Sequence, residues 1–357
     1  MTQSVWDIAI QQNRVKRESV KEVHEPTLLF IGSKNGGKTT IIHRFLERDD
    51  RVKPTLALDY TFGRKSAINF AAKSVVHIWE LGGGSQLADL IDITINPENV
   101  LNLTMILVLD LSKPEELWDT MEKLLDAARR RYRQLVSRAS QRELVHLQKS
   151  LCEMSERKSL SGHPDRELLD PFPLQFIMVG SKFDLFLNLP SEQQKIITRT
   201  LRFLNLYYGS SLFFISNKDE ATIKRLKNRL SRVAFGGSDS PSLQLETGKP
   251  LVIPEGMDSF SNIGTPPTTD FGSASVKTPL DMWKVAFCTR FTQKSSEGAL
   301  QASSPSSDPS KDPQFAEPLV DAALKIKDEE FVRSQRQNER RMRDLLQQAI
   351  SDGIVIA

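Results

Sequence analysis

A glycine-rich octapeptide, "GSKNGGKT", has the spacing G-x-x-x-x-G-K-T of a loop that binds phosphate groups. Its glycines let the backbone turn so that several N–H groups point at phosphate oxygens, while its lysine reaches the outer phosphates and its threonine hydroxyl can bind Mg²⁺. The apolar run "LLFI" before it and the helical run "TTIIHRFL" after it give the strand, loop and helix order that the motif requires. The predicted nucleotide-binding residues here are Gly32, Ser33, Lys34, Asn35, Gly36, Gly37, Lys38, Thr39 and Thr40.

Two further segments could complete a magnesium site. The segment "KPTLALDY" resembles the first switch of Ras-type guanine-nucleotide proteins, in which Thr55 would close over Mg²⁺ and the γ-phosphate. An edge strand after a proline turn is an alternative interpretation of this segment. The stretch "WELGGG" resembles the second switch. Glu80 stands in place of the magnesium-binding aspartate, and Gly83 matches the glycine of that switch. The predicted magnesium ligands are therefore Thr39, Thr55 and Glu80.

The residue that should position the attacking water is missing. Ras-type proteins carry a glutamine at that point of the second switch, and this chain has Gly84 instead. Because glycine has no side chain to orient water, we expect no meaningful intrinsic hydrolysis and interpret the protein as a non-enzyme with a degenerate G domain. Gln86 is the one candidate replacement, but it lies two residues late and would need a rearranged loop.

Two later stretches could bind the base of a nucleotide. Base recognition usually uses N-K-x-D, in which the aspartate accepts hydrogen bonds from guanine and the lysine covers the ring. The chain has "SKFD", which keeps the lysine and aspartate but loses the asparagine, so a guanine preference is weakened; "FFISNK" then matches the S-A-K stretch that contacts the base. We expect GTP or GDP with Mg²⁺, or a site without nucleotide. The predicted base-binding residues are Ser181, Lys182, Asp184, Ser216, Asn217 and Lys218.

The hydrophobic pattern predicts an α/β fold. Short apolar runs, "TLLFIGS", "VVHIWEL", "LTMILVLDL", "LQFIMVGS" and "LFFIS", alternate with helical segments, which is typical of a mainly parallel sheet with crossover helices. With the phosphate loop after the first run, this indicates a Ras-like P-loop G domain. We place it at residues 26–235, with a helical insertion at about 126–165, after an N-terminal extension at residues 1–25.

The C-terminal part is predicted to be largely extended or disordered, with short helices. Residues 236–312 are rich in glycine, serine and proline but contain two apolar islands, "LVIPEGMDSF" and "PLDMWKVAFCTRF", which we interpret as docking segments. The first could equally dock on the G domain or on a partner. The second places Trp283, Phe287 and Phe291 on one helical face, for which we expect a partner. Residues 313–357 form a charged helix or tail.

Composition excludes several functions. The net charge of +3 gives little reason to expect nucleic acid, and the basic run "RRRYR" is interpreted as a solvated helix face. The two cysteines, Cys152 and Cys288, lie far apart and have no metal-ligand spacing. The sequence has neither a signal peptide pattern nor a membrane-spanning apolar run, so we expect a soluble, intracellular protein without membrane insertion.

Longer phrases resemble one family, the light intermediate chains of cytoplasmic dynein-2. They include "GSKNGGKTTII", "KPTLALDY", "WELGGG", "LVLDLSKPEELWDTME", "GHPDRELLDPFP", "VGSKFD", "TLRFLNLYYGSSLFF" and "MDSFSNIGTPP", and extend from about residue 29 to 267. The resemblance implies a non-motor subunit with a Ras-like fold that binds and stabilises the dynein-2 heavy-chain tail in retrograde intraflagellar transport and cilium assembly. Its implied partners are this heavy chain, other dynein-2 subunits and, indirectly, intraflagellar transport particles and microtubules. Its implied locations are the cytoplasm, cytoskeleton and cilium, including axoneme and basal body.

Three alternatives stay open on the sequence. The protein could be a GTP-binding switch whose hydrolysis is supplied in trans by a partner. It could be a dynein-1-type light intermediate chain that links the motor to cargo adaptors. A P-loop kinase is the third, and the base-reading stretch "SKFD" counts against it.

Overall fold

The computed structural model describes residues 25–65, 74–139, 162–236, 242–267, 278–294 and 317–351. The chain divides into two compact units, residues 1–302 and 303–357, which are taken separately below. Of the predicted N-terminal extension, only Glu25 lies within the described residues, and Cys152 lies outside them.

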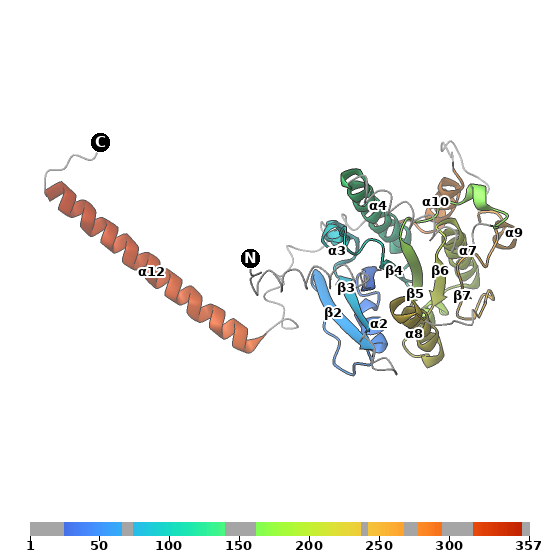
Figure 1. Ribbon diagram of the computed structural model, residues 1–357, viewed down its shortest axis with the longest axis horizontal. Coiled ribbons are helices and arrows are strands. Elements are labelled where there is room, and N and C mark those ends of the chain that lie inside the picture. The colour runs from blue at the N-terminus through green and yellow to red at the C-terminus, as the bar shows by residue number, and fades with distance from the viewer. Residues whose placement is uncertain are drawn as a thin grey trace, which may run out of the picture. The chain divides into compact units, whose positions relative to one another are not determined.

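The described part of the first unit is built on a seven-stranded sheet in the order β2-β3-β1-β4-β5-β6-β7 (Figure 1). Neighbouring strands from β3 to β6 pair in parallel, whereas β2 is antiparallel to β3 and β7 is antiparallel to β6. The predicted α/β fold with a mainly parallel sheet is confirmed. The strands are β1 (Thr27–Gly32), β2 (Leu58–Lys65), β3 (Ser74–Leu81), β4 (Leu103–Asp110), β5 (Gln175–Ser181), β6 (Ser211–Phe214) and β7 (Val252–Ile253).

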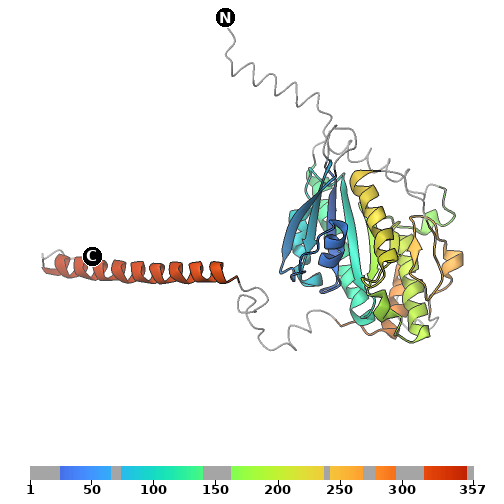
Figure 2. The ribbon, with the colours of Figure 1, turned by 90° about the horizontal axis from the view of Figure 1, so that it is seen from below.

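Helices cover both faces of the sheet (Figures 1 and 2). Leu28 and Phe30 of β1 share one buried cluster with α2 and α8, while Leu29 and Ile31 share the other with α4, α7 and α10. This alternation follows from the two-residue period of a strand. The helices of the unit are α2 (Lys38–Phe45), α3 (Ile91–Thr94), α4 (Pro114–Arg138), α6 (Phe183–Phe186), α7 (Ser191–Tyr207), α8 (Glu220–Phe235), α9 (Phe260–Ile263) and α10 (Pro279–Arg290), with 3₁₀ turns η1 (Gly84–Leu90) and η2 (Arg166–Leu168).

The predicted helical insertion at about 126–165 begins inside α4, a helix that packs on the sheet. Helix α4 runs without interruption from Pro114 to Arg138, and it buries Leu117, Met121 and Leu124 against the core. A proline at its first position and acidic residues in its first turn favour this start, because they suit the free N–H groups and the dipole there. Residues 140–161 lie outside the described part of the chain.

The expectation that the second apolar island binds a partner is wrong. Residues 279–290 form α10, and Trp283, Phe287 and Phe291 are buried in the first unit, at 4%, 0% and 7% exposure. Trp283 stacks on Phe203 of α7 at a centroid distance of 4.8 Å, and Phe287 lies 5.8 Å from Trp118 of α4. The aromatic face of α10 packs against α4 and α7 of its own domain, so it is part of the core.

The first island docks on the same domain, as one of its two alternatives predicted. Val252 and Ile253 form β7 on the edge of β6, and a buried ion pair holds the segment that follows. Arg202 of α7 donates two hydrogen bonds of 2.8 Å to the carboxylate of Asp258, whose side chain is 1% exposed. His163 donates through Nε2 to the Asp258 carbonyl oxygen at 2.7 Å. Three of the phrases that resemble the family are thus joined by one set of polar contacts.

The segment after α10 contacts the first turn of α4. The side-chain amide of Gln293 accepts hydrogen bonds from Trp118 N and Asp119 N at 3.0 and 3.2 Å and donates to Pro114 O at 3.1 Å. Lys294 N donates to Glu115 O at 2.9 Å. Trp118 N and Asp119 N ordinarily donate to Pro114 O and Glu115 O in a helix, so Gln293 and Lys294 bond to the paired groups of this turn and not to its free N–H groups.

The second unit contains one described helix, α12 (Pro318–Ser351). Between residues 318 and 343, where side chains are described, its apolar side chains are solvent-exposed within this unit, with Leu324 at 61% and Phe331 at 68% exposure. Helices of this kind are stabilised mainly by a partner surface, because propensity alone contributes little.

We predict that Phe287→Ala lowers the free energy of unfolding of the first unit by about 3–5 kcal/mol, since it removes a fully buried ring that packs on Trp118 of α4. Urea denaturation followed by tryptophan fluorescence measures the change. The matched control is Leu324→Ala on the exposed α12, for which we expect less than about 0.5 kcal/mol. Equal, small effects of both changes would contradict the docking of α10.

Candidate nucleotide-binding site

The predicted site residues gather at one edge of the sheet. Strands β1, β3, β4 and β5 are parallel, so their carboxyl ends meet there, and the loop from β1 to α2 crosses this edge (Figure 1). In doubly wound α/β sheets, ligands bind at this edge. The register places Asp110, the last residue of β4, opposite Ser181, the last residue of β5.

The phosphate loop is held against β4. Gly32 has φ 137°, and a Cβ atom added to it would lie 1.9 Å from the Val108 carbonyl oxygen, so only glycine fits. Ser33 N donates to that same oxygen at 2.9 Å, and Ser33 Oγ accepts from Asp110 N at 3.2 Å. Lys34 and Asn35 are exposed at the tip of the loop, and Thr40 lies in the first turn of α2.

The loop lysine is buried and bonded to main-chain carbonyl groups. Lys38 Nζ donates to the carbonyl oxygens of Ser33 and Gly32 at 2.9 and 3.3 Å. Burial lowers the pKa of Lys38 to about 8, and the nearby Glu80 carboxylate opposes that shift only in part. A bound phosphate would favour the charged lysine, because it would supply the missing counter-charge.

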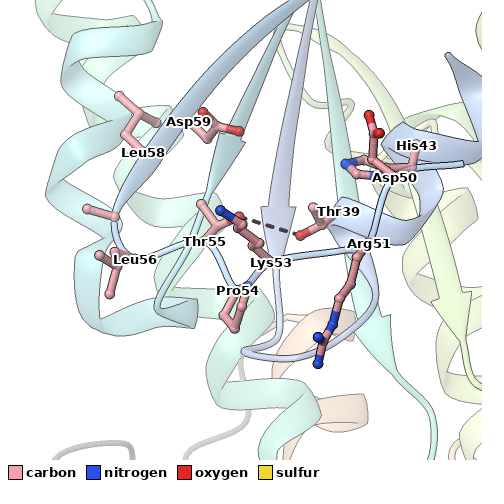
Figure 3. Close-up of a pocket in the computed structure, with 11 residues that line it drawn as sticks. Thr39, His43, Asp50, Arg51, Lys53, Pro54, Thr55, Leu56, Leu58 and Asp59 are labelled. Atoms are coloured by element: carbon pink, nitrogen blue, oxygen red, sulfur yellow. Dashed lines mark hydrogen bonds between the residues drawn. The ribbon is translucent and has the colours of Figure 1, made fainter. Parts of the chain in front are cut away.

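The three predicted magnesium ligands lie together. Thr39 Oγ1 donates to Glu80 Oε1 at 2.7 Å. It also lies 3.4 Å from Thr55 Oγ1 (Figure 3). Two neighbouring ligands of an octahedral Mg²⁺, each at about 2.1 Å from the ion, lie about 3 Å apart, so both hydroxyls and the carboxylate fit such an ion. Burial raises the pKa of Glu80, while hydrogen bonds from Thr39 and the charge of Lys38 oppose that shift. Among the described residues, no group of three or more His, Cys, Asp or Glu side chains offers another metal site.

Main-chain contacts bring the first switch segment to this site. Gly82 N donates to Ala57 O at 2.6 Å, and a Cβ atom on Gly82 would lie 2.3 Å from the Thr55 carbonyl oxygen. The edge strand β2 begins only at Leu58, so Thr55 lies in the loop before it. The edge-strand interpretation therefore holds from Leu58 onward, and the switch role of Thr55 stays a prediction.

A cavity of about 540 Å³ lies between α2 and the first switch segment (Figure 3). This volume is in the range of small-ligand sites. Both cationic and acidic side chains line the cavity, together with the hydroxyl groups of Thr39 and Thr55. The lining residues are Thr39, His43, Asp50, Arg51, Lys53, Pro54, Thr55, Leu56, Ala57, Leu58 and Asp59.

The second switch approaches the phosphate loop with its backbone only. Gly83 and Gly84 have φ values of 71° and 68°, and a Cβ atom on Gly84 would lie 3.2 Å from Lys34 N. Gln86 lies in the 3₁₀ turn η1 that follows. The main chain of the second switch thus lies close to the phosphate loop at the position of the missing glutamine.

The predicted base-binding residues divide into two groups. Asp184 accepts a hydrogen bond from Ser216 Oγ at 2.8 Å and pairs with Lys218 Nζ at 2.8 Å; the hydrogen bond from Lys218 is the main cause that lowers the pKa of Asp184. Asn217 lies in the exposed turn between these two partners. A carboxylate kept ionised can accept two hydrogen bonds from an amide-like base edge such as that of guanine.

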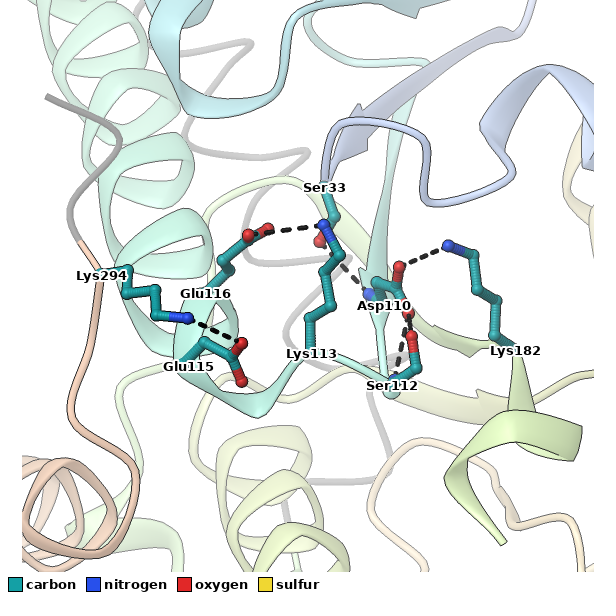
Figure 4. A network of polar contacts seen from close by, with 8 residues as sticks. All are labelled: Ser33, Asp110, Ser112, Lys113, Glu115, Glu116, Lys182 and Lys294. Carbon is teal, nitrogen blue, oxygen red and sulfur yellow. Dashed lines mark hydrogen bonds and ion pairs between the residues drawn. The ribbon is translucent and has the colours of Figure 1, made fainter. Parts of the chain in front are cut away.

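The second group centres on a residue that the motifs missed. Lys182 Nζ donates to Asp110 Oδ2 at 2.6 Å (Figure 4). Ser181 Oγ donates to Leu109 O at 3.2 Å. Asp110 is buried at the end of β4. A carboxylate that ends the apolar run "LTMILVLD" is the sequence signal that could have identified it.

Two other expectations concern the surface. In the run "RRRYR", Arg129 pairs with Asp170 at 2.8 Å, Arg130 pairs with Asp89 at 2.6 Å, and Arg131 donates to the Ile95 carbonyl oxygen at 2.9 Å. These arginines are thus engaged within the chain. Within the described residues, no helix combines the length and apolarity needed to cross a membrane.

Comparison with known proteins gives the family. Residues 2–167 match the family described as "Dynein light intermediate chain (DLIC)". Over 96% of its length the chain is 42% identical to "Cytoplasmic dynein 2 light intermediate chain 1" of Danio rerio, and the match covers 97% of that protein. The chain belongs to the dynein light intermediate chain family. The family member of the same name from Homo sapiens is 39% identical over 94% of this chain and 96% of its own length.

The predicted resemblance to dynein-2 light intermediate chains is therefore confirmed. A solved structure, "Crystal Structure of the Dynein Light Intermediate Chain's Conserved Domain", aligns with 67% of this chain and 84% of its own at a TM-score of 0.51 and 16% identity. It shows that the fold of the first unit is that of the family. The family match to residues 2–167 includes the phosphate loop and both switch segments, while the base-binding stretches lie beyond it.

We predict that the affinity of the loop for GDP falls as the pH rises above 8. In the empty loop Lys38 has a pKa of about 8, so it is charged below that pH and neutral above it. Because the anion binds the charged form, affinity is greatest below pH 8 and falls by up to about tenfold per pH unit above it. Calorimetric titration between pH 7 and 9 measures this slope. Lys38→Met should bind weakly without such a slope, and an equal slope in that variant would contradict the role of Lys38.

Proposed function

We propose that this chain is a non-motor light intermediate chain subunit of the cytoplasmic dynein-2 complex. In this role it binds and stabilises the heavy-chain tail for retrograde intraflagellar transport and cilium assembly, in the cytoplasm, cytoskeleton and cilium. The observation that carries the proposal is similarity along nearly the whole chain to proteins named as this subunit in fish and mammals, at 39–42% identity. Similarity of that extent includes the segments outside the nucleotide-binding core, which a shared G domain alone would not explain.

The packing of the C-terminal segments limits where a partner can bind. The apolar islands are used within the first unit, so they are no longer free for the heavy chain. The surface of the first unit and the exposed apolar side chains of α12 remain as contact regions. The proposed contact is therefore a surface formed by a completed fold.

We infer that the site binds a guanine nucleotide, GTP or GDP with Mg²⁺, in a structural or regulatory role without catalysis. Support comes from the phosphate loop, from the Thr39, Thr55 and Glu80 group, and from the ionised Asp184 beside Ser216. The absence of a water-orienting side chain at Gly84 supports the non-catalytic part. A switch with hydrolysis supplied in trans is the second candidate, favoured by the approach of the Thr39 and Thr55 hydroxyls to 3.4 Å.

We expect the full chain to co-purify with the dynein-2 heavy-chain tail from ciliated cells, and more strongly than with the dynein-1 heavy-chain tail. Lys38→Met should retain this association, since the contact is a surface. A truncation after Ala302 tests the contribution of α12. Loss of the heavy-chain association in Lys38→Met alone would favour a nucleotide-gated switch. Stronger co-purification with the dynein-1 heavy-chain tail would contradict the proposed complex.

We expect single-turnover GTP hydrolysis to stay at the background rate of solution. Gly84 offers no group to orient water, and Gln86 lies in η1. Rapid quench with labelled GTP, in the presence of Mg²⁺, gives the rate. Gln86→Ala is the matched variant and should equal the unmodified chain. A Ras-like rate that Gln86→Ala abolishes would refute this expectation.

A further inference from the structure

The base-binding end of the site differs from the usual motif in one residue, which raises the question of what takes its place. The motif has asparagine where this chain has Ser181. An asparagine side chain carries two donors and an acceptor, so it can bridge several groups, whereas serine has one donor. The Ser181 hydroxyl donates to Leu109 O within the sheet, at 3.2 Å. Another group has to connect the base-binding loop to the phosphate loop.

Asp110 makes that connection. Its Oδ2 accepts from Lys182 Nζ at 2.6 Å, and its Oδ1 accepts from Ser112 Oγ and Ser112 N at 2.6 and 3.0 Å (Figure 4). Its own N–H donates to Ser33 Oγ in the phosphate loop at 3.2 Å. The Asp110 side chain is 1% exposed, so the carboxylate is fixed by these bonds and lies outside the reach of bulk water.

Lys182, which makes this contact, also has an unusual backbone conformation at the start of α6. It has φ 57°, a left-handed value that costs energy in a residue other than glycine, and its side chain is one-third exposed. The ammonium group is directed to Asp110, which leaves the methylene stem as the part that a bound base can cover. The charge of the lysine is balanced by Asp110 and not by the phosphates.

We propose that Asp110 is a positioning residue that fixes Lys182 for the guanine ring and ties the base-binding loop to the phosphate loop, in place of the missing asparagine. This inference rests on the proposed guanine-nucleotide binding and specifies how the base is distinguished. It does not depend on the heavy-chain contact. A role confined to folding would weaken all phosphate ligands equally, whereas this role affects only a ligand whose base Asp184 holds against Lys182, which is the guanine base.

The test compares GDP, ADP and pyrophosphate by calorimetric titration of the full chain. In Asp110→Asn we expect the Kd for GDP to rise about tenfold, as the loss of one charge-assisted hydrogen bond predicts, with the Kd for ADP and pyrophosphate unchanged. Lys182→Met should give the same selective loss, and the double variant should lose no more than either single change. Lys113→Met is the matched control, because this neighbouring lysine pairs with Glu116 at the surface at 3.4 Å.

Three results would overturn the inference. The first is an unchanged ratio of the GDP and ADP constants in a folded Asp110→Asn variant. The second is an equal loss for all three ligands, and the third is an unmodified chain with no preference for GDP or no binding of it. The third result does not bear on the proposed heavy-chain association, which is measured separately by co-purification. A single variant leaves one member of the Asp110–Lys182 pair buried without its partner and could unfold for that reason. In that case the double variant with Asp110→Asn and Lys182→Met, which has no unpaired charge, decides. Its Kd for ADP should equal that of the unmodified chain, and its Kd for GDP should be about tenfold higher.

Discussion

The hydrogen bond from Ser33 N to the Val108 carbonyl oxygen fixes the rest of the site. It requires glycine at position 32, because any side chain there would overlap the same carbonyl. With the phosphate loop held on β4 in this way, Lys38 is buried and the end of β4 is placed beside the loop. Asp110 can then contact both Ser33 and Lys182. One close main-chain contact therefore sets the geometry of the phosphate and base ends together.

The charges of the site are arranged at the expense of stability. Lys38 and Glu80 are both buried, and burial shifts the pKa of each toward its neutral form. Such groups favour the folded state less than apolar residues would, so the remainder of the sheet has to supply the stability. The strands on either side do so, since every residue of β1 and β4 is buried. A bound anion and cation would relieve this penalty, which makes the empty site the less stable form.

The sequence predicted what depends on local pattern and missed what depends on distant packing. The central strands and the phosphate loop follow from apolar runs and glycine spacing, and the magnesium group followed from the order of the motifs. The docking of α10 was not predicted. The surface that receives Trp283 includes Phe203, which lies about 80 positions earlier, and no local stretch of sequence contains both. The antiparallel strands β2 and β7 and the role of Asp110 were missed for the same reason, since strand neighbours and side-chain partners are set by the tertiary fold.

The hydrogen bonds of Gln293 with the first turn of α4 have a consequence for synthesis on the ribosome. Gln293 and Trp118 are separated by 175 residues, so these bonds form only after nearly all of the domain has been translated. Contacts of such high sequence separation also slow folding, because the loop entropy is lost before the contact is gained. At about 5–20 residues per second, synthesis from Trp118 to Gln293 takes roughly 10–35 s. Until α10 has been translated, the apolar surface around Trp118 and Phe203 that receives its aromatic side chains stays uncovered.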